Sequence, residues 1–356
     1  MFFAILNPGS DSLKYSFFEK LGKEIIEVTS DVMPAKQKLD LPLLSKAEVI
    51  GIRVVHGGAL FQKPTKITAK VIKTLESLIP LAPLHNPVSL QYIKELQKLY
   101  PKVPLIAVFD TEFHKDIPDK AAYYGMQKKL TKKYGIRRFG FHGLAHEWML
   151  EEFARLEKKK KNHCNLITLQ LGSGCSGCLI QSGNSIDTSM GFSPLEGVMM
   201  RTRSGTIDAS IIFYLLEQKK WKLKDLRDLL FQDSGLKGIG GYEGRMNDLL
   251  KHEKNDQNAK DAIEMFIYQI QKLIGSYCAI LPRLDGIVFS GGISEYNPSI
   301  IEKILKPLKH LGISIDIKKK EEFPRNIADK HSKIPVYVVE MNENLMIARK
   351  IVEKTL

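Results

Sequence analysis

The feature that most constrains the fold of this chain is a pattern that occurs once in each half. A run of branched and aromatic residues, a turn of glycine and hydroxyl residues, and a second such run appear at 4–19 and again at 165–180. Each copy predicts a β-hairpin, and two copies predict a duplicated fold whose turns face one another across a cleft. Because glycine and serine leave backbone N–H groups unobstructed, each turn is a candidate cradle for phosphate oxygens. A single glycine-serine hairpin is commonly no more than a turn, so only the pair of hairpins indicates phosphate binding.

Further segments predict alternating strands and helices. Six apolar runs have the length and composition of buried strands: Phe2 to Leu6, Gly51 to Val55, Pro104 to Phe109, Asn165 to Leu171, Gly286 to Ser290 and Pro335 to Val339. Apolar residues at helical spacing predict a helix over 259–280, and Asn86 before Pro87 predicts the N-cap of another. A glycine-rich segment at 285–298 predicts a strand-to-helix turn, with a helix that opens near Asn297 and Pro298. A chain of 356 residues with this alternation indicates an α/β protein of two domains.

Charge and hydropathy argue against two classes of partner. The chain has a net charge of +13, but much of the excess lies in lysine runs such as 158–161 and 318–320, which are typical of solvated loops. No basic stripe is interleaved with aromatic residues, so we expect an anionic small-molecule substrate and no nucleic acid. The opening MFFAIL lacks a preceding basic region, and no apolar stretch reaches the roughly 18 residues of a membrane span. We therefore expect a cytoplasmic protein with no membrane segment.

The four cysteines do not predict a disulfide framework in a chain of this length. Cys175 and Cys178 form a single CxxC pair with no second pair and no nearby histidine set. Small buried core residues explain them better than a redox or metal site.

Four polar residues stand inside apolar, turn-bounded segments and are the candidates for chemistry. They are Arg53 in GIRVVHGG, Asp110 in VFDTEFH, His142 in RFGFHGLAH and Arg203 in RTRSGTID. Burying such a group is unfavourable unless it is paired or used, and for any one of them a structural ion pair is the simpler explanation. Together, two arginines, a histidine and a carboxylate near phosphate-cradling turns are what phosphoryl transfer requires.

These segments, in this order, resemble the acetate kinase family. The resemblance rests on NPGSDSLKY, RVVHGG, LAPLHNP, FDTEFH, GFHGLAH, SIDTSMGFSPLEGVMMRTRSGTID, FSGGISE and ENLMIAR, and it spans nearly the whole chain. It implies a duplicated actin-like α/β fold with a central cleft, of the ribonuclease H-like kind shared by acetate and sugar kinases, heat-shock proteins and actin. It also implies a first domain of 1–114 plus 344–356, and a second domain of 115–343 with the nucleotide site and a homodimer interface.

The resemblance implies reversible transfer of the γ-phosphoryl group of ATP to acetate, with Mg²⁺ or Mn²⁺ as cofactor, to give acetyl phosphate and ADP. Arg53 and Arg203 would bind the carboxylate and the phosphoryl group, and His142 would stabilise the transition state by a hydrogen bond. Asp110 would have a supporting or base role. Asn7 would lie close to the transferring group and, with Glu343, at the metal.

Two sets of binding residues follow from the same resemblance. The methyl group of the acceptor would lie in an apolar pocket of Val55, Leu84, Phe141 and Pro194. Such a pocket separates acetate from propionate by only about 1 to 3 kcal/mol. The nucleotide and its phosphates would contact Ser10, Ser12, Lys14, Gly172, Ser173, Gly174, Arg245, Asn247, Gly291, Gly292 and Ile293.

Departures from the family pattern concentrate at the nucleotide end. The second glycine turn has Gln170, Ser173 and Cys175 where the family has His, Asn and Ala. Further changes place Arg201 for Gly, Thr206 for an acid, Arg245 for Asp, Asn247 for Arg and Tyr296 for Asn. Three hypotheses follow: ATP held mainly through backbone contacts, a different donor such as another nucleotide or pyrophosphate, and a non-catalytic sensor of nucleotide or acyl phosphate. Retention of Arg53, Asp110, His142, Arg203 and Glu343 argues against the sensor.

Overall fold

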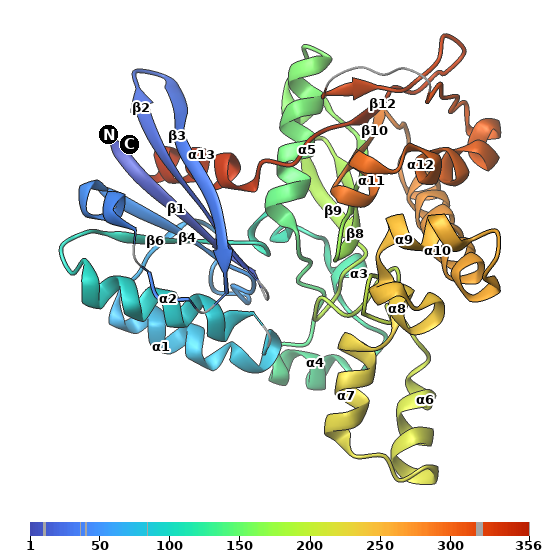
Figure 1. The fold of residues 1–356 in the computed structure, drawn as a ribbon, viewed down its shortest axis with the longest axis horizontal. Helices are drawn as coiled ribbons and strands as arrows, with labels where there is room; N and C mark the ends of the chain where they lie inside the picture. Colours follow the sequence, from blue (N-terminus) through green and yellow to red (C-terminus); the bar gives the residue numbers. More distant parts are fainter. Residues whose placement is uncertain (10–11, 36, 40, 84, 318–322, 356) are drawn as a thin grey trace.

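Two mixed β-sheets with the same topology lie at the centres of the two halves of the molecule (Figure 1). The structure is a computed structural model, and it describes residues 1–356 except 10–11, 36, 40, 84, 318–322 and 356, with only the backbone of Thr355. Ser10 and Leu84, two of the predicted site residues, therefore lie outside the described residues.

The first sheet has the strand order β3-β2-β1-β4-β6-β5. Its strands are β1 (Phe2–Pro8), β2 (Ser12–Leu21), β3 (Glu24–Pro34), β4 (Val49–Val54), β5 (Thr65–Lys66) and β6 (Leu105–Phe109). β1, β2 and β3 form an antiparallel meander, while β1, β4 and β6 run parallel to one another. In the hairpin register Asn7 pairs with Lys14, so both side chains lie close to the first glycine turn.

The second sheet has the strand order β11-β12-β10-β7-β8-β9. Its strands are β7 (Leu166–Leu171), β8 (Cys175–Gln181), β9 (Asn184–Thr188), β10 (Gly286–Ser290), β11 (Arg325–Asn326) and β12 (Val336–Val338). β7, β8 and β9 again form an antiparallel meander, and β7, β10 and β12 again run parallel. The two sheets thus repeat one topology, and the prediction of a duplicated fold with one glycine hairpin in each half is confirmed.

Helices connect the strands and cover both sheets. The α-helices are α1 (Ala69–Ser77), α2 (Asn86–Leu99), α3 (Asp119–Ala122), α4 (Lys128–Tyr134), α5 (Gly143–Leu156), α6 (Ala209–Phe213), α7 (Leu223–Gln232), α8 (Gly235–Gly240), α9 (Met246–His252), α10 (Gln257–Ile280), α11 (Gly292–Tyr296), α12 (Pro298–Leu305) and α13 (Glu343–Thr355). Short 3₁₀ helices occur at Pro42–Lys46, Ile79–Leu81, Glu112–His114, Lys161–His163, Tyr242–Gly244 and Lys306–Leu311, and a π-helical segment, Tyr214–Gln218, follows α6. No helix among the described residues is long and apolar enough to cross a membrane.

Three apolar cores hold these elements together. One joins the first sheet to α1 and α2, and another joins the second sheet to α10 and α12. The core between the sheets is built on α5 and α13, and it takes residues from both sheets, such as Phe3 and Val288. The C-terminal helix therefore packs on the first sheet while it also contacts α5. Cys164, Cys175 and Cys178 are buried free thiols in these cores.

The six predicted strands occur within one or two residues of their expected bounds, and the predicted helix over 259–280 is α10. One detail of the prediction was wrong. Asn86 is the first residue of α2 and not its N-cap, because its buried amide exchanges two hydrogen bonds of 3.1 Å with the backbone of His56. The helix predicted to open near Asn297 and Pro298 is α12, which begins at Pro298 with Asn297 as its N-cap, and a short helix that was not predicted, α11, precedes it from Gly292.

A buried ion triad joins the C-terminal helix to the segment that follows β6 and to α5. The ammonium group of Lys350 lies 2.9 Å from Glu112 Oε1 and 2.6 Å from Glu147 Oε2, and its side chain is only 9% exposed. Removal of one partner of such a group leaves the others desolvated and uncompensated, which is strongly destabilising. The triad therefore fixes α13 to α5, and Glu343 and His142 lie at the first turns of these two helices.

We expect the substitution Lys350→Met to lower the free energy of unfolding by about 3 to 5 kcal/mol, because Glu112 and Glu147 lose their common cation. Urea titration of the purified protein measures the change. Lys354→Met, at an exposed position of the same helix, is the matched control, with an effect within about 0.5 kcal/mol. Equal stabilities of the two variants would contradict the prediction.

Candidate active site

Three neighbouring parallel strands place polar side chains at one edge of the first sheet. Asn7 lies near the end of β1, Arg53 near the end of β4, and Asp110 directly after β6. These strands are adjacent in the order β1-β4-β6, so their carboxyl ends meet at the same edge. Ligands of α/β sheets bind at this edge. The first turn of α13 brings Glu343 to the same place, since Asn7 Nδ2 donates to Glu343 Oε2 at 2.9 Å.

Arg53 is the centre of this group. Its Nε and Nη2 atoms donate to the two oxygens of Asp110, at 2.7 and 2.5 Å, and Nη1 donates to Asn7 Oδ1 at 2.9 Å. Glu343 Oε2 lies 3.8 Å from Nη1. A guanidinium group has five N–H donors, so two of them remain for a ligand. The bidentate pair also fixes the plane of the guanidinium group.

Opposite charges determine the ionisation of this group. Burial disfavours the charge of Arg53, but Asp110 and Glu343 outweigh it and raise the pKa of Arg53 above its usual range. Burial likewise opposes ionisation of Glu343, but Arg53, the amide of Asn7 and the ammonium group of Lys14 outweigh it and lower the pKa of Glu343. The group therefore presents a fixed cation beside a fixed anion.

The second half of the molecule contributes His142, which directly precedes α5. His142 adopts a left-handed conformation with φ of 56°. The next residue must be glycine, because a Cβ atom at Gly143 would lie 2.2 Å from the carbonyl oxygen of Asp110. The helix thus begins in contact with the loop after β6, and Nδ1 of His142 lies 2.8 Å from Ser176 Oγ. Burial, and then Arg53 and Arg203, lower the pKa of His142 to about 3, so the imidazole is neutral.

Arg203 reaches the same point from the loop after β9. Its Nη1 donates to the carbonyl oxygen of Pro194 at 3.1 Å, and no ion pair joins Arg203 to any carboxylate of the described residues. Burial lowers the pKa of Arg203, as expected for a cation without a counter-ion. A Cβ atom placed on Gly174 would lie 3.1 Å from His142 Nε2 and 3.6 Å from Arg203 Nη1, so both groups point at the second glycine turn.

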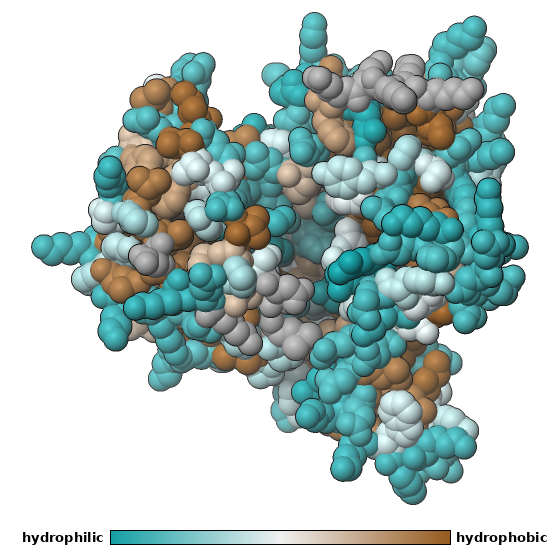
Figure 2. Space-filling model, in the orientation of Figure 1, coloured by the Kyte–Doolittle hydropathy of each residue, from teal (hydrophilic) through white to brown (hydrophobic). Residues whose placement is uncertain are grey.

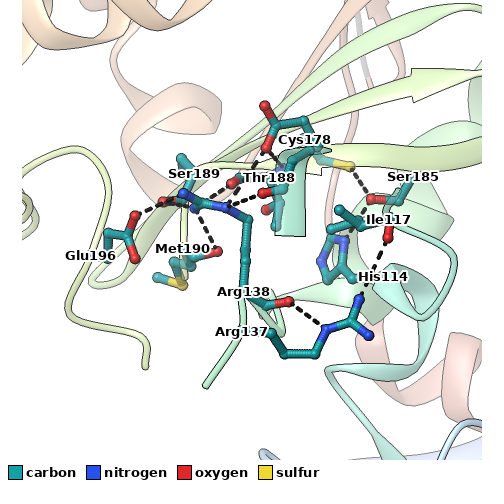
Figure 3. A network of polar contacts seen from close by, with 12 residues as sticks. His114, Ile117, Arg137, Arg138, Cys178, Ser185, Thr188, Ser189, Met190 and Glu196 are labelled. Carbon is teal, nitrogen blue, oxygen red and sulfur yellow. Dashed lines mark hydrogen bonds and ion pairs between the residues drawn. The ribbon is translucent and has the colours of Figure 1, made fainter. Parts of the chain in front are cut away.

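The loop that carries Pro194 is held by Arg138. Figure 3 shows the guanidinium group of Arg138 among backbone carbonyl oxygens of this loop and the carboxylate of Glu196. Its Nη1 donates to Thr188 O at 2.8 Å, and its Nη2 donates to Glu196 Oε1 at 2.8 Å. Arg138 thus holds the loop in place and does not line the cleft.

An apolar wall adjoins the two arginines. Val55, Phe141 and Pro194 are buried, and Val55 and Phe141 belong to one core cluster. His85 stands close by, since burial, and then Arg203 and Arg53, lower its pKa to about 3. In the sequence His85 stands within the motif LAPLHNP, which predicts no role for it.

A cleft of about 1180 Å³ lies between the two halves, and Figure 2 shows its hollow with a hydrophilic surface. The second glycine turn, residues of β1 and β2 on either side of the first glycine turn, and the segment after β10 line it. Of the predicted nucleotide residues, those on its wall are Lys14, Gly172, Ser173, Arg245, Asn247, Gly291, Gly292 and Ile293. Asn7 and Glu343 lie at the end of the cleft that leads to Arg53. Ser12 and Gly174 do not line it.

The third glycine turn depends on Glu295, a residue for which the sequence predicts no role. Glu295 Oε1 accepts hydrogen bonds from Gly291 N at 2.7 Å and from Met341 N at 3.2 Å. Gly291 has a φ of 90°, and a Cβ atom there would lie 2.6 Å from Leu171 O. Glu295 thus ties the glycine turn to the segment that leads into α13 and Glu343. Asn344, another residue without an assigned role, accepts from Asn7 and donates to Ser16.

Two of the departures from the family pattern have unpartnered polar atoms on the cleft wall. Nε of Arg201 and Oε1 of Gln170 are buried and have no hydrogen-bond partner among the described residues. Arg245 and Asn247 are exposed on the same wall. The two unpartnered atoms and the side chains of Arg245 and Asn247 are available to a ligand in the cleft.

The donor set for a metal ion is small. Among the described residues no group of three or more His, Cys, Asp or Glu side chains could hold a metal ion. Glu343 is an ionised carboxylate at the cleft, whereas Asn7 Oδ1 already accepts from Arg53. One carboxylate suits Mg²⁺, which protein sites commonly bind through one or two carboxylates, waters and the phosphates of a substrate. The residues present therefore fit a magnesium ion that arrives with a nucleotide.

Comparison with known proteins gives concordant results. The sequence profile of the Acetokinase family matches residues 32–349. The acetate kinase of Bacillus cytotoxicus is 37% identical over 98% of this chain and 97% of its own, and that of Sulfurimonas denitrificans is 38% identical over 97% of each chain. Among solved structures, the propionate kinase of Francisella tularensis has a TM-score of 0.87 at 34% identity and 98% coverage of both chains. The acetate kinase of Porphyromonas gingivalis has a TM-score of 0.88 at 28% identity and full coverage of both. The predicted fold class is confirmed.

The buried histidines predict how stability depends on pH. Burial lowers the pKa of His56 and His114 to about 4, and that of His85 and His142 to about 3. Below pH about 6.5 the unfolded chain binds protons that the folded chain does not bind, so stability falls as pH falls from there towards about 4. Each such histidine adds up to about 1.4 kcal/mol per pH unit.

We expect His114→Gln to reduce this slope, measured by urea unfolding between pH 7 and pH 5, by up to about 1.4 kcal/mol per pH unit. His163→Gln, at an exposed position, is the control and should leave the slope unchanged. A slope in His114→Gln equal to that of the wild type would show that His114 is not held neutral.

Proposed function

Because this chain belongs to the Acetokinase family, we propose that it transfers the γ-phosphoryl group of ATP reversibly to acetate, giving acetyl phosphate and ADP. It is thus a phosphotransferase with a carboxyl group as acceptor. The proposal extends the activity named for the relatives to this chain through the arrangement of its own residues.

The observation that carries the proposal is the state of Arg203. Its guanidinium group is desolvated and has no carboxylate partner among the described residues. A desolvated cation without a counter-ion is unfavourable unless an anionic ligand completes it. Because Arg203 and the neutral imidazole of His142 both point at Gly174, the missing anion belongs beside the second glycine turn. A phosphoryl group in the cleft would occupy this place.

Phosphoryl transfer to acetate does not require a strong general base. The acceptor oxygen of acetate is already anionic, so the main barrier is the approach of two anions. Arg203 and the free N–H groups of Arg53 reduce that repulsion, and their forked geometry orients the carboxylate for in-line attack. Both oxygens of Asp110 accept hydrogen bonds from Arg53, so we assign Asp110 the supporting role and not the base role.

Asn7 would align the remaining groups. Its amide oxygen accepts from Arg53 and its amide nitrogen donates to Glu343, so it bridges the cation and the anion of the site. Glu343 would hold Mg²⁺, and the direct metal contact predicted for Asn7 stays a prediction. When bound, the metal neutralises charge on the phosphate oxygens of the nucleotide.

The acceptor pocket would be formed by Val55, Phe141 and Pro194, which lie beside the arginines. An extra methylene group changes binding in such a pocket by about 1 to 3 kcal/mol. Propionate is therefore a second acceptor under this proposal, with acetate preferred if the pocket is as small as the resemblance implies.

The organisation of the chain follows the same proposal. We place the domain boundary so that 1–114 plus 344–356 form the first domain and 115–343 form the second. The packing of α13 on the first sheet supports this division. We also propose a homodimer formed through the second domain, located in the cytoplasm.

A second candidate keeps the chemistry and changes the donor. Arg201, whose buried Nε has no hydrogen-bond partner in the described part of the chain, stands near the second glycine turn, since its backbone N–H donates to Ser173 O at 3.2 Å. An added guanidinium group favours binding through phosphates over binding through the nucleoside. Another nucleotide or pyrophosphate could then replace ATP. A non-catalytic sensor would not need the bidentate Arg53 pair and the free Arg203 together.

We expect Arg203→Ala to lower the rate of acyl phosphate formation by about 10³-fold, because the cation that offsets the phosphoryl charge is lost. Trapping of the product as the hydroxamate, with acetate, ATP and Mg²⁺, measures the rate. Arg203→Lys keeps the charge but loses the fork, so it should recover only part of the loss. Arg283→Ala, at a side chain that is 72% exposed, is the control. A wild-type rate in Arg203→Ala would refute the mechanism.

A panel of donors separates the two candidates. We expect ATP to support product formation that saturates, and we expect Arg201→Gly to raise the KM for the donor by about tenfold through loss of one charged hydrogen bond. The KM for acetate should not change, which is the internal control. Product from GTP or pyrophosphate but not from ATP would instead establish the second candidate. An unchanged donor KM in Arg201→Gly would remove Arg201 from the donor site.

A further inference from the structure

A chain of hydrogen bonds runs from His142 into the core of the second half. His142 Nδ1 lies 2.8 Å from Ser176 Oγ, which lies 2.9 Å from His146 Nε2. His146 Nδ1 in turn lies 2.8 Å from Thr168 Oγ1. Ser176, His146 and Thr168 are fully buried. These four residues, which we call the relay, come from three elements: β7, β8 and the first turns of α5.

The relay couples the proton positions of the two imidazoles. Each neutral imidazole has one N–H and each hydroxyl has one O–H, so two arrangements use every proton of the chain. In one, Thr168 donates to His146, His146 to Ser176, and Ser176 to His142 Nδ1, which leaves the proton of His142 on Nε2.

In the opposite arrangement every bond is reversed, and Thr168 donates to the carbonyl oxygen of Cys178 at 3.5 Å. His142 then carries its proton on Nδ1 and presents a bare lone pair at Nε2. A mixed arrangement, in which Ser176 accepts from both histidines, would leave the proton of Ser176 without an acceptor among the described residues.

The surroundings of His142 Nε2, at the cleft end of the relay, decide which of the two arrangements can bind a phosphoryl group. Nε2 of His142 points at the second glycine turn beside Arg203, where the proposed function places the phosphoryl group. A lone pair there would repel phosphoryl oxygens, whereas an N–H would donate to them. A charged imidazolium would also donate, but burial, and then Arg53 and Arg203, hold the pKa of His142 at about 3. Glu343 is the nearby anion that acts against this shift, and His114 is a further neighbour that acts with it.

We propose, on the basis of the proposed function, that Ser176 and His146 are positioning residues that make His142 a neutral hydrogen-bond donor at Nε2 to the transferring phosphoryl group. An anion in the cleft selects the first arrangement, and the relay then holds all of its protons in one direction. A neutral donor also avoids a third positive charge beside the two arginines.

The same structure offers a matched control for the loss of a buried hydroxyl. His114 Nε2 lies 2.9 Å from the carbonyl oxygen of Phe141, which can only accept, so His114 receives at Nδ1 a hydrogen bond from Ser185 Oγ at 2.8 Å. Figure 3 shows His114, Ser185 and Cys178 in this second chain. Ser185 is as buried as Ser176 but does not bond to His142.

The test compares Ser176→Ala with Ser185→Ala in the full-length protein. We expect Ser176→Ala to lower kcat by about 10- to 100-fold, as for other supporting partners of functional histidines. The KM values for ATP and acetate should not change, because an interaction made only in the transition state affects kcat and kcat/KM equally. Thr168→Val, at the far end of the relay, should have a smaller effect in the same direction. Ser185→Ala should keep the wild-type kcat.

A spectroscopic measurement reports the tautomer directly. In the protein labelled with ¹⁵N-histidine and bound to ADP, Mg²⁺, acetate and aluminium fluoride as a planar phosphoryl mimic, long-range ¹H–¹⁵N correlation should show neutral His142 protonated on Nε2. Ser176→Ala should show an increased fraction protonated on Nδ1.

Two results would overturn the relay: an imidazolium or Nδ1-protonated His142 in the wild-type complex, or equal kcat losses in Ser176→Ala and Ser185→Ala. Failure of the proposed function would give a different result from failure of the relay alone, because the wild type would then form no acyl phosphate from any donor. The proposed role of the relay would be refuted by that result as well.

Discussion

The bidentate pair between Arg53 and Asp110 is the interaction on which the rest of the site depends. It joins two neighbouring parallel strands at the edge where ligands bind, and its distances of 2.7 and 2.5 Å fix the guanidinium plane. With that plane fixed, the third donor of Arg53 meets Asn7, and Asn7 meets Glu343 on the C-terminal helix. The pair therefore positions residues from both ends of the chain. Its burial means that either partner alone would be strongly destabilising.

Each half of the molecule contributes one arginine to the site, and the two arginines differ in whether a carboxylate of the protein balances their charge. Arg53 is paired with the carboxylate of Asp110 and keeps two N–H groups for a ligand, so it serves stability and ligand binding together. Arg203 has no such partner among the described residues, so its charge is available to a ligand. His142 lies between them and stays neutral. This combination provides a strong positive field without three adjacent charges, and it explains why the small anions of phosphoryl transfer suit this site better than a large polyanion.

The residues around Arg53 match the family pattern, whereas several residues on the nucleotide wall of the cleft depart from it, and the two groups differ in burial. Asn7, Arg53 and Asp110 lie at the ends of buried strands, and each makes several hydrogen bonds, so substitution there is costly. Arg245 and Asn247 lie on an exposed wall of the cleft, in the turn before α9 and in its first turn. Side chains on such a wall can change while glycine turns keep their backbone contacts. The exposure of Arg245 and Asn247 thus explains why these two positions can depart from the family pattern.

The sequence by itself determined the duplicated hairpins, the alternation of strands and helices, and the identity of the charged residues of the site. These properties are local: periodicity of two or 3.6 residues, glycine at turns, and charges within apolar runs. Only the tertiary structure decided which residues meet. The amide of Asn86 bonds with His56 instead of capping its helix. Glu295 joins Gly291 to Met341, which are 50 positions apart in the sequence and meet only in the fold. Ser176 connects His142 to His146. Hydrogen-bond partners from separate strands leave no periodic signal in the chain, because their meeting depends on how the two sheets and α5 pack together.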